Sequence, residues 1–334
     1  MESLGERGLV SLIRRRFPAG PPLLPVGIGD DAAVASPARG ELEVLTTDAL
    51  VEGVHFDLSF CSFEDVGYKS LAVNVSDVAA MGGTSRLALL SLMLPAGVTV
   101  AQIESLLDGF EQIAREAGVT LAGGNVTRSP GPLIVDVSLL GSVRPRKLLT
   151  RSGGRPGDAL YVTGAVGAAA AGLGWLQEHP AGTPDLPEDE GLVACIRRYR
   201  RPEPRARLGA ILGRTRAAGA CMDLSDGLAD AVRQIAGASG TGATIDAELL
   251  PIPGSVRQWF GGRGEDPVRA SVAGGDDYEL LFTVPPRRRG RLRSALRHAR
   301  GVPVTQIGEV TAGPEIVLVT ARGPEPLPEG FRHF

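Results

Sequence analysis

Lysine and long apolar runs are the two features that this 334-residue sequence most clearly lacks. Only Lys69 and Lys147 are lysines among 35 basic residues, so arginine usage is a general bias and a single arginine carries little information. The longest apolar runs, around residues 87–94 and 165–176, fall short of the ~20 residues that a membrane-spanning helix needs. No apolar stretch follows the first residues, which argues against a secretory signal. We therefore expect no membrane partner.

Excess positive charge and paired cysteines are also missing. The net charge is −3 and the isoelectric point is near 5.9, so no basic field attracts a polyanion and nucleic acid is not expected as a partner. Cys61, Cys195 and Cys221 are widely spaced, which fits neither a disulfide framework nor a CxxC metal site. These absences predict a cytoplasmic protein that acts on small ligands.

Several common catalytic signatures are absent. No Gly-Lys-Ser/Thr phosphate loop, no HRD or DFG kinase motif and no Gly-x-Ser-x-Gly elbow occurs. No Cys/His nucleophile pair has support in the sequence, so we expect no covalent catalytic residue. If the protein uses ATP, it binds the nucleotide through another architecture.

The hydrophobic patterns predict an α/β protein with two domains. Five stretches rich in Val, Ile, Leu and Thr read as strands: 42–50, 86–94, 132–143, 158–163 and 315–320. Helices are predicted over 64–81, after the capping box of Thr99 and Gln102, and after Gly227. The segment 144–158 is rich in Arg, Gly and Pro, so we place the boundary there and predict domains of 1–145 and 146–334.

Acidic turns are the most informative motif. Gly27 to Ala32 matches a loose GxGxxA dinucleotide pattern, but its two carboxylates would repel a pyrophosphate that needs bare amides. A bridging Mg²⁺ reverses this argument, because Mg²⁺ prefers oxygen ligands and is commonly shared with substrate phosphates. The simpler alternative is that Asp favours turns.

Repetition of such turns favours one shared metal site. Acidic residues recur at the ends of predicted strands and helices, at 30–31, 46–48, 77, 223–226 and 276–277. The four histidines are scattered, which disfavours zinc, and no EF-hand loop is present, which disfavours calcium. We expect Mg²⁺ and, through it, the phosphates of ATP.

A few further residues have both a functional and an ordinary interpretation. Gly124 and its neighbours in 123–128 either face a phosphate or form a tight turn. For Lys69 and Arg151 solvated surface is the better expectation, and a lone His55 is more often structural. Phe331 lies near the end of the chain, where simple docking is natural, although an aromatic face also stacks on planar rings.

Five motifs together resemble one enzyme family. They are GIGDDAA at 27–33, TTDALVEGVHF at 46–56, KSLAVNVSDVAAMG at 69–82, MDLSDGL at 222–228 and GGDDYEL at 274–280. In this set the sequence is similar to the thiamine-monophosphate kinases, from about residue 25 to the end. The resemblance implies the α/β (α+β) two-domain fold of the aminoimidazole ribonucleotide synthetase superfamily, whose N-terminal mixed sheet forms the barrel of a homodimer.

The resemblance also implies an activity and a set of site residues. The implied reaction converts thiamine monophosphate and ATP into thiamine diphosphate and ADP, with several Mg²⁺ ions and direct in-line phosphoryl transfer. The implied contacts to thiamine monophosphate are His55, Asp276 and Phe331, and those to ATP are Gly124, Asn125, Arg151 and Ser225. The implied metal ligands are Asp31, Thr46, Thr47, Asp48, Asp77, Asn125, Asp223 and Asp226.

Two positions depart from the family pattern. Asn125 stands where the family has a metal-binding Asp, which removes one negative charge from the site. Asp276 stands where Glu is common. The alternatives are another ATP-using member of the superfamily, although the sulfur chemistry of two such members lacks a matching cysteine here, or a sensor that binds nucleotide or thiamine phosphate without turnover.

Overall fold

The computed structural model describes residues 5–17, 24–28, 32–180, 186–299 and 301–331, with the side chains of 5–7 left out. The chain forms two compact units. Unit 1 comprises residues 1–78 and 84–145, and unit 2 comprises residues 79–83 and 146–334. The main division falls between residues 145 and 146, while the short turn 79–83 groups with unit 2.

Unit 1 is built on a four-stranded mixed sheet. Its strands are β1 (Leu42–Val51), β2 (Thr84–Leu94), β3 (Thr120–Arg128) and β4 (Ile134–Val143), in the order β1-β4-β2-β3. Only the β2–β3 pair is parallel. Val135, Val137 and Leu139 of β4 are fully buried, whereas the residues between them are partly exposed, so one face of the sheet is covered.

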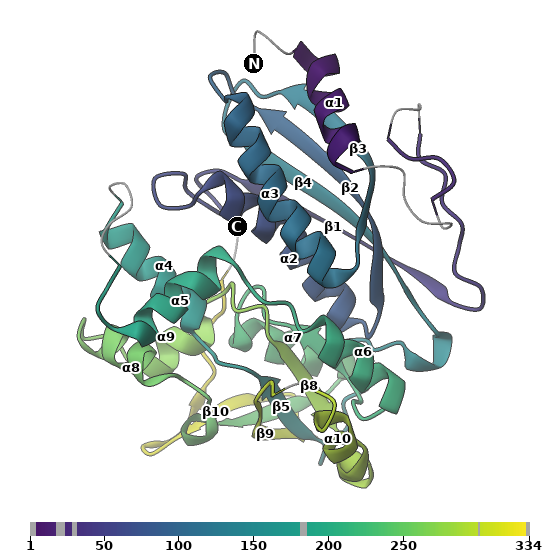
Figure 1. Ribbon diagram of the computed structural model, residues 1–334. Helices are drawn as coiled ribbons and strands as arrows, with labels where there is room; N and C mark the ends of the chain where they lie inside the picture. The colour runs from purple at the N-terminus through teal and green to yellow at the C-terminus, as the bar shows by residue number, and fades with distance from the viewer. Residues whose placement is uncertain (1–4, 18–23, 29–31, 181–185, 300, 332–334) are drawn as a thin grey trace. The chain divides into compact units, whose positions relative to one another are not determined.

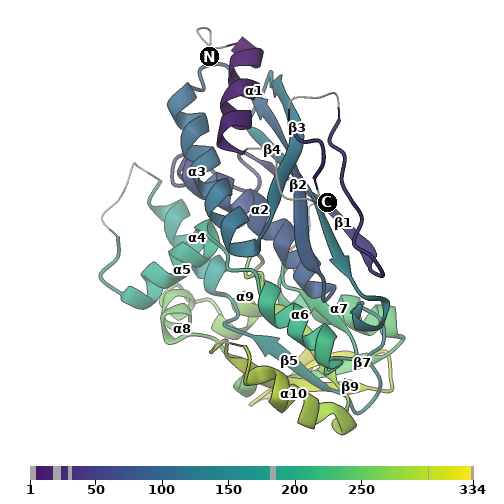
Figure 2. The same cartoon turned by 45° about the vertical axis from the view of Figure 1, so that its right-hand side comes forward.

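Helices α2 (Phe63–Ala80) and α3 (Val100–Ala117) cover that face, as Figures 1 and 2 show from two directions. The capping box of Thr99 and Gln102 starts α3, and Gly118 in the left-handed conformation ends it. A Cβ on Gly67 of α2 would lie 1.8 Å from the carbonyl oxygen of Leu106. The two helices therefore touch backbone to backbone. Helix α1 (Gly5–Arg16) is tied to α3 by a salt bridge from Arg16 to Glu111.

Unit 2 is built on a seven-stranded mixed sheet in the order β11-β10-β7-β9-β5-β8-β6. Its core strands are short and buried, and all five residues of β8 are buried. The bounds are β5 (Ala159–Thr163), β6 (Cys221–Asp223), β7 (Gly242–Asp246), β8 (Leu280–Val284), β9 (Val304–Thr311), β10 (Ile316–Thr320) and β11 (Gly323–Pro326).

Seven α-helices of unit 2 are described, and two of them pack on one face of its sheet. These two are α6 (Ala206–Thr215) and α10 (Arg289–Leu296), whose Leu212 and Leu292 share a hydrophobic core with Phe282 of β8. The others are α4 (Ala168–Glu178), α5 (Glu190–Arg200), α7 (Leu228–Ser239), α8 (Gly254–Gly261) and α9 (Pro267–Ala273).

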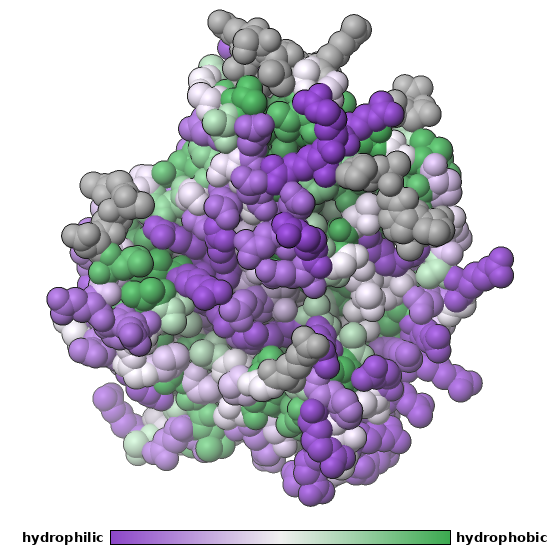
Figure 3. All heavy atoms as spheres, in the orientation of Figure 1, coloured by the Kyte–Doolittle hydropathy of each residue, from purple (hydrophilic) through white to green (hydrophobic). Residues whose placement is uncertain are grey.

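The structure confirms the strands and helices predicted from the hydrophobic pattern, with ends that shift by at most two residues. Hydrophilic side chains dominate the face of the molecule drawn in Figure 3, in keeping with 22% charged residues. In the parts of the chain that are described, no helix combines the length and the apolar character needed to cross a membrane.

Candidate active site

Strand β1 of unit 1 brings one predicted metal ligand into contact with another on helix α2. The hydroxyl of Thr46 donates a hydrogen bond of 2.5 Å to Oδ2 of Asp77, in the last turns of α2. Asp48 lies two residues further along β1, opposite the buried Val137 of β4, and so shares the helix-covered face with Thr46. Thr46, Asp48 and Asp77 therefore lie on the same side of the sheet.

Thr47 and Asn125 lie on the opposite face. The hydroxyl of Thr47 donates to Oδ1 of Asp136 at 3.0 Å and lies 3.1 Å from the hydroxyl oxygen of Ser138. Asn125 of β3 pairs with Ser91 of β2, which in turn pairs with Asp136 of β4. Residues paired across a sheet point to the same face. The predicted ligands of unit 1 thus divide between the two faces.

Asp136 is a polar site residue that sequence reasoning missed. It is partly exposed on β4, between the fully buried Val135 and Val137. In the sequence, this aspartate stands between two valines of a predicted strand. Alternate residues of a strand point to opposite faces, so an acid between buried valines lies on the open face of the sheet. Its carboxylate accepts the hydroxyl of Thr47 and lies in one cross-strand row with Asn125.

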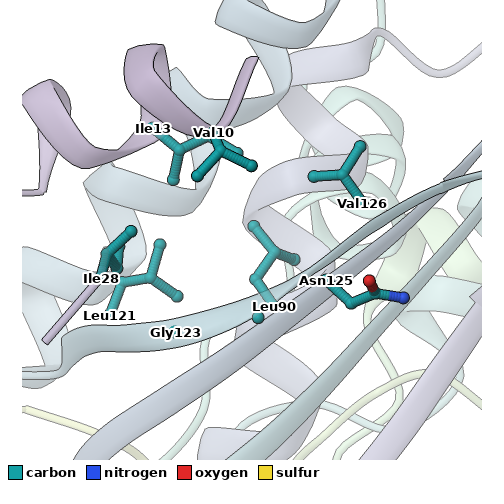
Figure 4. Close-up of a pocket in the computed structure, with 9 residues that line it drawn as sticks. Val10, Ile13, Ile28, Leu90, Leu121, Gly123, Asn125 and Val126 are labelled. Carbon is teal, nitrogen blue, oxygen red and sulfur yellow. The ribbon is translucent and has the colours of Figure 1, made fainter. Parts of the chain in front are cut away.

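Gly124 occupies a position on β3 that only glycine fits. A Cβ there would lie 1.8 Å from the carbonyl oxygen of Leu90 on β2. Gly124 and Asn125 line a pocket of about 150 Å³ whose other walls are mostly apolar, including Val10 and Ile13 of α1 (Figure 4). This small pocket therefore joins apolar walls to the exposed backbone of a glycine pair.

His55 and Lys69 lie together beyond the end of β1. The backbone N–H of Val51 donates to Nδ1 of His55 at 3.1 Å, which places the proton of the neutral imidazole on Nε2. The ammonium group of Lys69 donates to the carbonyl oxygen of His55 at 3.3 Å. Lys69 is only 3% exposed, so the expectation of a solvated surface lysine is wrong. It faces inward because it extends from the buried side of α2.

In unit 2, three segments that are far apart in the sequence meet at one place. The backbone N–H of Asp276 donates to the carbonyl oxygen of Ser225 at 2.7 Å, and that of Phe331 donates to the carbonyl oxygen of Asp226 at 3.2 Å. Phe331 is 51% exposed, as its place near the end of the chain predicted. Asp223 ends β6 just before this turn and is buried. The structure therefore gathers the predicted metal, ATP and substrate positions of unit 2, apart from Arg151.

Two buried carboxylates hold this turn. Sequence reasoning counted Asp277 among the acidic residues of an expected metal site and did not single out Glu279. Asp277 is fully buried and accepts the N–H groups of Gly167 at 2.6 Å and Ala169 at 2.9 Å, at the start of α4. Glu279 is also fully buried and accepts two N–H groups of Arg205, at 2.6 and 2.5 Å. Burial raises the pKa of Asp277 to about 7, against the lowering effect of its two backbone donors.

Asp276 itself has a φ of 68°, in the left-handed region that side chains rarely adopt. Such a conformation costs on the order of 1–2 kcal/mol and persists only where neighbouring contacts enforce it. Here those contacts are the hydrogen bond to Ser225 and the buried anchor at Asp277. The side chain of Asp276 is thus presented by a fixed backbone.

The remaining predicted residues do not join these groups. Arg151 is exposed, and the neighbouring Thr150 accepts a hydrogen bond from the N–H of Cys221, at the end of β6 opposite the acidic turn. Asp31 lies outside the described residues. Among the residues that the structure does describe, no three His, Cys, Asp or Glu side chains form a ready cation cluster. Carboxylates around a magnesium site repel one another without the ion, so close clustering is not required of them.

Family models match both units of the chain. Residues 29–143 match the AIR synthase related protein N-terminal domain, and residues 155–320 match the corresponding C-terminal domain. The two-domain fold with mixed sheets and this pair of matches define the class: the chain is an AIR synthase related protein.

Curated relatives narrow the class to one family. The chain is 40% identical over 312 residues to the thiamine-monophosphate kinase of Escherichia coli K12, with 92% of each chain covered. It is 35% identical over 321 residues to that of Bacillus subtilis 168, covering 92% of this chain and 93% of the relative. The chain belongs to the thiamine-monophosphate kinase family.

Solved structures agree with this assignment. The thiamine-monophosphate kinase of Stenotrophomonas maltophilia K279a superposes with a TM-score of 0.83 at 36% identity, over 94% of this chain and 96% of the other. A structure described as AaThiL complexed with AMPPCP and TMP gives a TM-score of 0.78 at 32% identity, over 100% and 98%. A hydrogenase maturation protein in complex with ATP, at 21% identity and a TM-score of 0.76, shares the fold.

The buried carboxyl of Asp277 makes folding stability depend on pH. Its pKa in the folded state lies above the ordinary value of 3.8, so the folded state binds this proton more tightly between about pH 4 and 7. The contribution to the free energy of unfolding therefore falls as pH rises through that window, by at most ~1.4 kcal/mol per pH unit. We expect Asp277→Asn to remove this slope, measured by urea denaturation in EDTA at pH 5, 6, 7 and 8.

The matched control is Asp266→Asn. Asp266 also accepts two backbone N–H groups at a helix start, that of α9, but it is exposed. This variant should keep the wild-type slope. A slope unchanged in Asp277→Asn would show that the carboxyl is already ionised below pH 5.

Proposed function

We propose that this chain transfers the γ-phosphoryl group of ATP directly to the phosphate of thiamine monophosphate, giving thiamine diphosphate and ADP. Full-length membership of the thiamine-monophosphate kinase family carries the proposal. Its support in the structure is the meeting of Ser225, Asp226, Asp276 and Phe331 at one turn. Phosphoryl transfer depends on alignment and charge neutralisation, so the absence of a nucleophile motif is no obstacle.

Magnesium is the second part of the proposal. The ligand set consists of oxygen donors, from carboxylates, threonines and one amide, and this is the chemistry that Mg²⁺ prefers. The Thr46–Asp77 pair and the turn at Asp223 and Asp226 would hold the ion in their respective units. The ion supplies the positive charge that two anionic substrates need in order to approach each other.

The chain's own residues divide the remaining tasks. The backbone at Gly124 is bare and lies beside the apolar pocket, so it supports an assignment to ATP. Asp276 is held on a fixed backbone, and Phe331 presents an exposed ring whose N–H is tied to Asp226. An acid and an aromatic face together suit a cationic, planar thiamine ring. His55, with its proton on Nε2, offers a donor to a phosphate oxygen.

The reaction is tested by product formation. Purified protein with ATP, thiamine monophosphate and Mg²⁺ should form thiamine diphosphate steadily, and excess EDTA should abolish the activity. Thiamine and aminoimidazole precursors serve as competing acceptors and should give no product. Another activity within the superfamily would be indicated by turnover of a precursor. Binding of ATP without any product would support a nucleotide sensor instead.

Asn125 is expected to raise the magnesium requirement. The Asn125→Asp variant restores a carboxylate on the face that carries Asp136 and Thr47. An added carboxylate should lower the Mg²⁺ concentration for half-maximal rate by roughly fivefold, since one closer negative charge at an exposed site is worth ~1 kcal/mol. Initial rates at a series of Mg²⁺ concentrations measure it.

Gln258→Glu is the control for Asn125→Asp, because Gln258 lies exposed on α8 in unit 2. It adds the same charge away from the assigned ligands and should leave the magnesium curve unchanged. Superimposable curves for wild type and Asn125→Asp would remove Asn125 from the metal site.

We also propose a homodimer formed through the open face of the unit 1 sheet. Leu45 of β1 is 71% exposed and Leu89 of β2 is 40% exposed, and their pairing with Leu140 and Ser138 of β4 puts both on the face away from α2 and α3. Large apolar side chains exposed on two strands of one open sheet face mark an interaction surface. Strands β1 and β2 supply that surface.

The dimer is tested by sedimentation velocity. Leu45→Glu should shift the protein toward monomer by burying a charge at the interface. Leu249→Glu, at a site that is 47% exposed in unit 2, changes the same residue type elsewhere and should leave the sedimentation coefficient unchanged. Equal behaviour of the two variants would place the interface on another surface.

A further inference from the structure

Unit 2 contains a second cavity, unlike the site described above. Its volume is about 490 Å³, within the range of small-molecule pockets. Its walls carry three guanidinium groups, one carboxylate and bare backbone. The lining residues used here are Arg155, Arg287, Arg288, Asp158, Gly153 and Gly219.

The backbone of this cavity is shaped by a close approach of two chain segments. Gly153 has a φ of 115°, and a Cβ there would lie 2.8 Å from the carbonyl oxygen of Gly219. Asp158 is 3% exposed, and its carboxylate accepts the backbone N–H of Arg155 at 3.1 Å. Arg288 donates to the carbonyl oxygen of Ala218 at 2.7 Å. These contacts fix the cavity wall while leaving charged side chains along it.

Positive charge around the cavity is in excess. Within the described residues, none of Arg155, Arg287 and Arg288 forms an ion pair with a carboxylate. Arg216 and Arg291 lie near enough that burial and repulsion from its arginine neighbours lower the pKa of Arg288. Three guanidiniums thus act on the one buried carboxylate, Asp158, and two more act on Arg288. Neighbouring guanidinium groups repel one another, which costs the folded protein free energy. A bound anion removes this repulsion.

The cavity is separate from the acidic turn. Asp276 and Asp277 precede the amino end of β8, whereas Pro285 to Arg288 follow its carboxyl end. The five residues of β8 span ~16 Å at ~3.3 Å per residue. Asp158 and Gly219 lie at the same end as the arginines, because Ala159 of β5 pairs with Val284 and Cys221 of β6 pairs with Phe282.

We propose that this arginine-lined cavity binds a diphosphate group. Guanidinium forks match phosphate oxygens in pairs, and several forks along one wall suit two linked phosphates better than one. The cavity volume leaves room for an organic group beyond the diphosphate. Two kinds of molecule carry a diphosphate group. One is free inorganic pyrophosphate, and the other is a small organic diphosphate such as ADP or thiamine diphosphate, the two products of the proposed reaction.

Calorimetric titration with inorganic pyrophosphate in excess EDTA tests the site. Without a divalent ion the acidic turns repel phosphates, so the heat reports on the arginine cavity alone. We expect one site per chain, at least tenfold tighter for pyrophosphate than for inorganic phosphate. Arg155→Gln/Arg287→Gln should weaken binding at least tenfold, and both side chains are exposed, so the variant folds.

The matched control removes the same charge beside the cavity. Arg293→Gln/Arg297→Gln lie exposed on or just after α10, outside the lining, and should change the affinity less than twofold. Arg151→Gln should also change it less than twofold. Displacement of pyrophosphate by ADP or thiamine diphosphate identifies an organic occupant, and its absence identifies free pyrophosphate.

Three results would overturn the proposal. One is the absence of pyrophosphate binding in EDTA. Binding of an oligonucleotide in place of pyrophosphate counts as the same result. A second is equal affinity for phosphate and pyrophosphate. The third is loss of binding in Arg151→Gln as large as in the double variant, which would make the cavity an extension of the ATP site. None of these outcomes depends on whether the chain turns over thiamine monophosphate.

Discussion

Two buried carboxylates fix the backbone of the acidic turn in unit 2. Asp277 and Glu279 lie on either side of Tyr278 and are both fully buried, where an uncompensated carboxylate would cost several kcal/mol. Glu279 is compensated by the two-pronged contact of Arg205, and Asp277 by two N–H groups at the start of α4. With both side chains held, Asp276 and Tyr278 take positive φ values. Their backbone N–H groups donate to the carbonyl oxygens of Ser225 and Leu224, respectively.

Acidic and basic groups in this chain meet phosphate in opposite ways. The acidic turns repel phosphate directly and become compatible with it only through a cation, which is why the proposed function couples ATP to magnesium. The arginines at the other end of β8 attract phosphate without any metal. Strand β8 therefore separates an acidic turn that repels anions from an arginine-lined cavity that attracts them. The excess of arginine over lysine makes the basic region insensitive to pH, because guanidinium stays protonated throughout the physiological range.

Sequence reasoning predicted the fold, while its site residues stay predictions. It missed features that depend on side-chain direction. Periodicity located α3 and β1 because their apolar residues recur at fixed spacing. The motif resemblance named Thr46 and Thr47 together, but adjacent residues of a strand point to opposite faces, so the structure separates their side chains. Lys69 looked like solvated surface because burial of an amine is not visible in composition. Asp136 and Asp277 needed cross-strand partners and helix amides that only the folded chain supplies.

The fully buried strand β8 also sets where the chain tolerates change in length. All five of its residues are buried, with β5 on one side and β6 on the other, so a one-residue insertion would turn every side chain to the wrong face. It would displace the acidic turn and the arginine cavity in the same step. The exposed turn between β9 and β10, at residues 312–315, belongs to neither the acidic turn nor the cavity lining. Length variation among homologous chains should therefore accumulate at that turn and be excluded from β8.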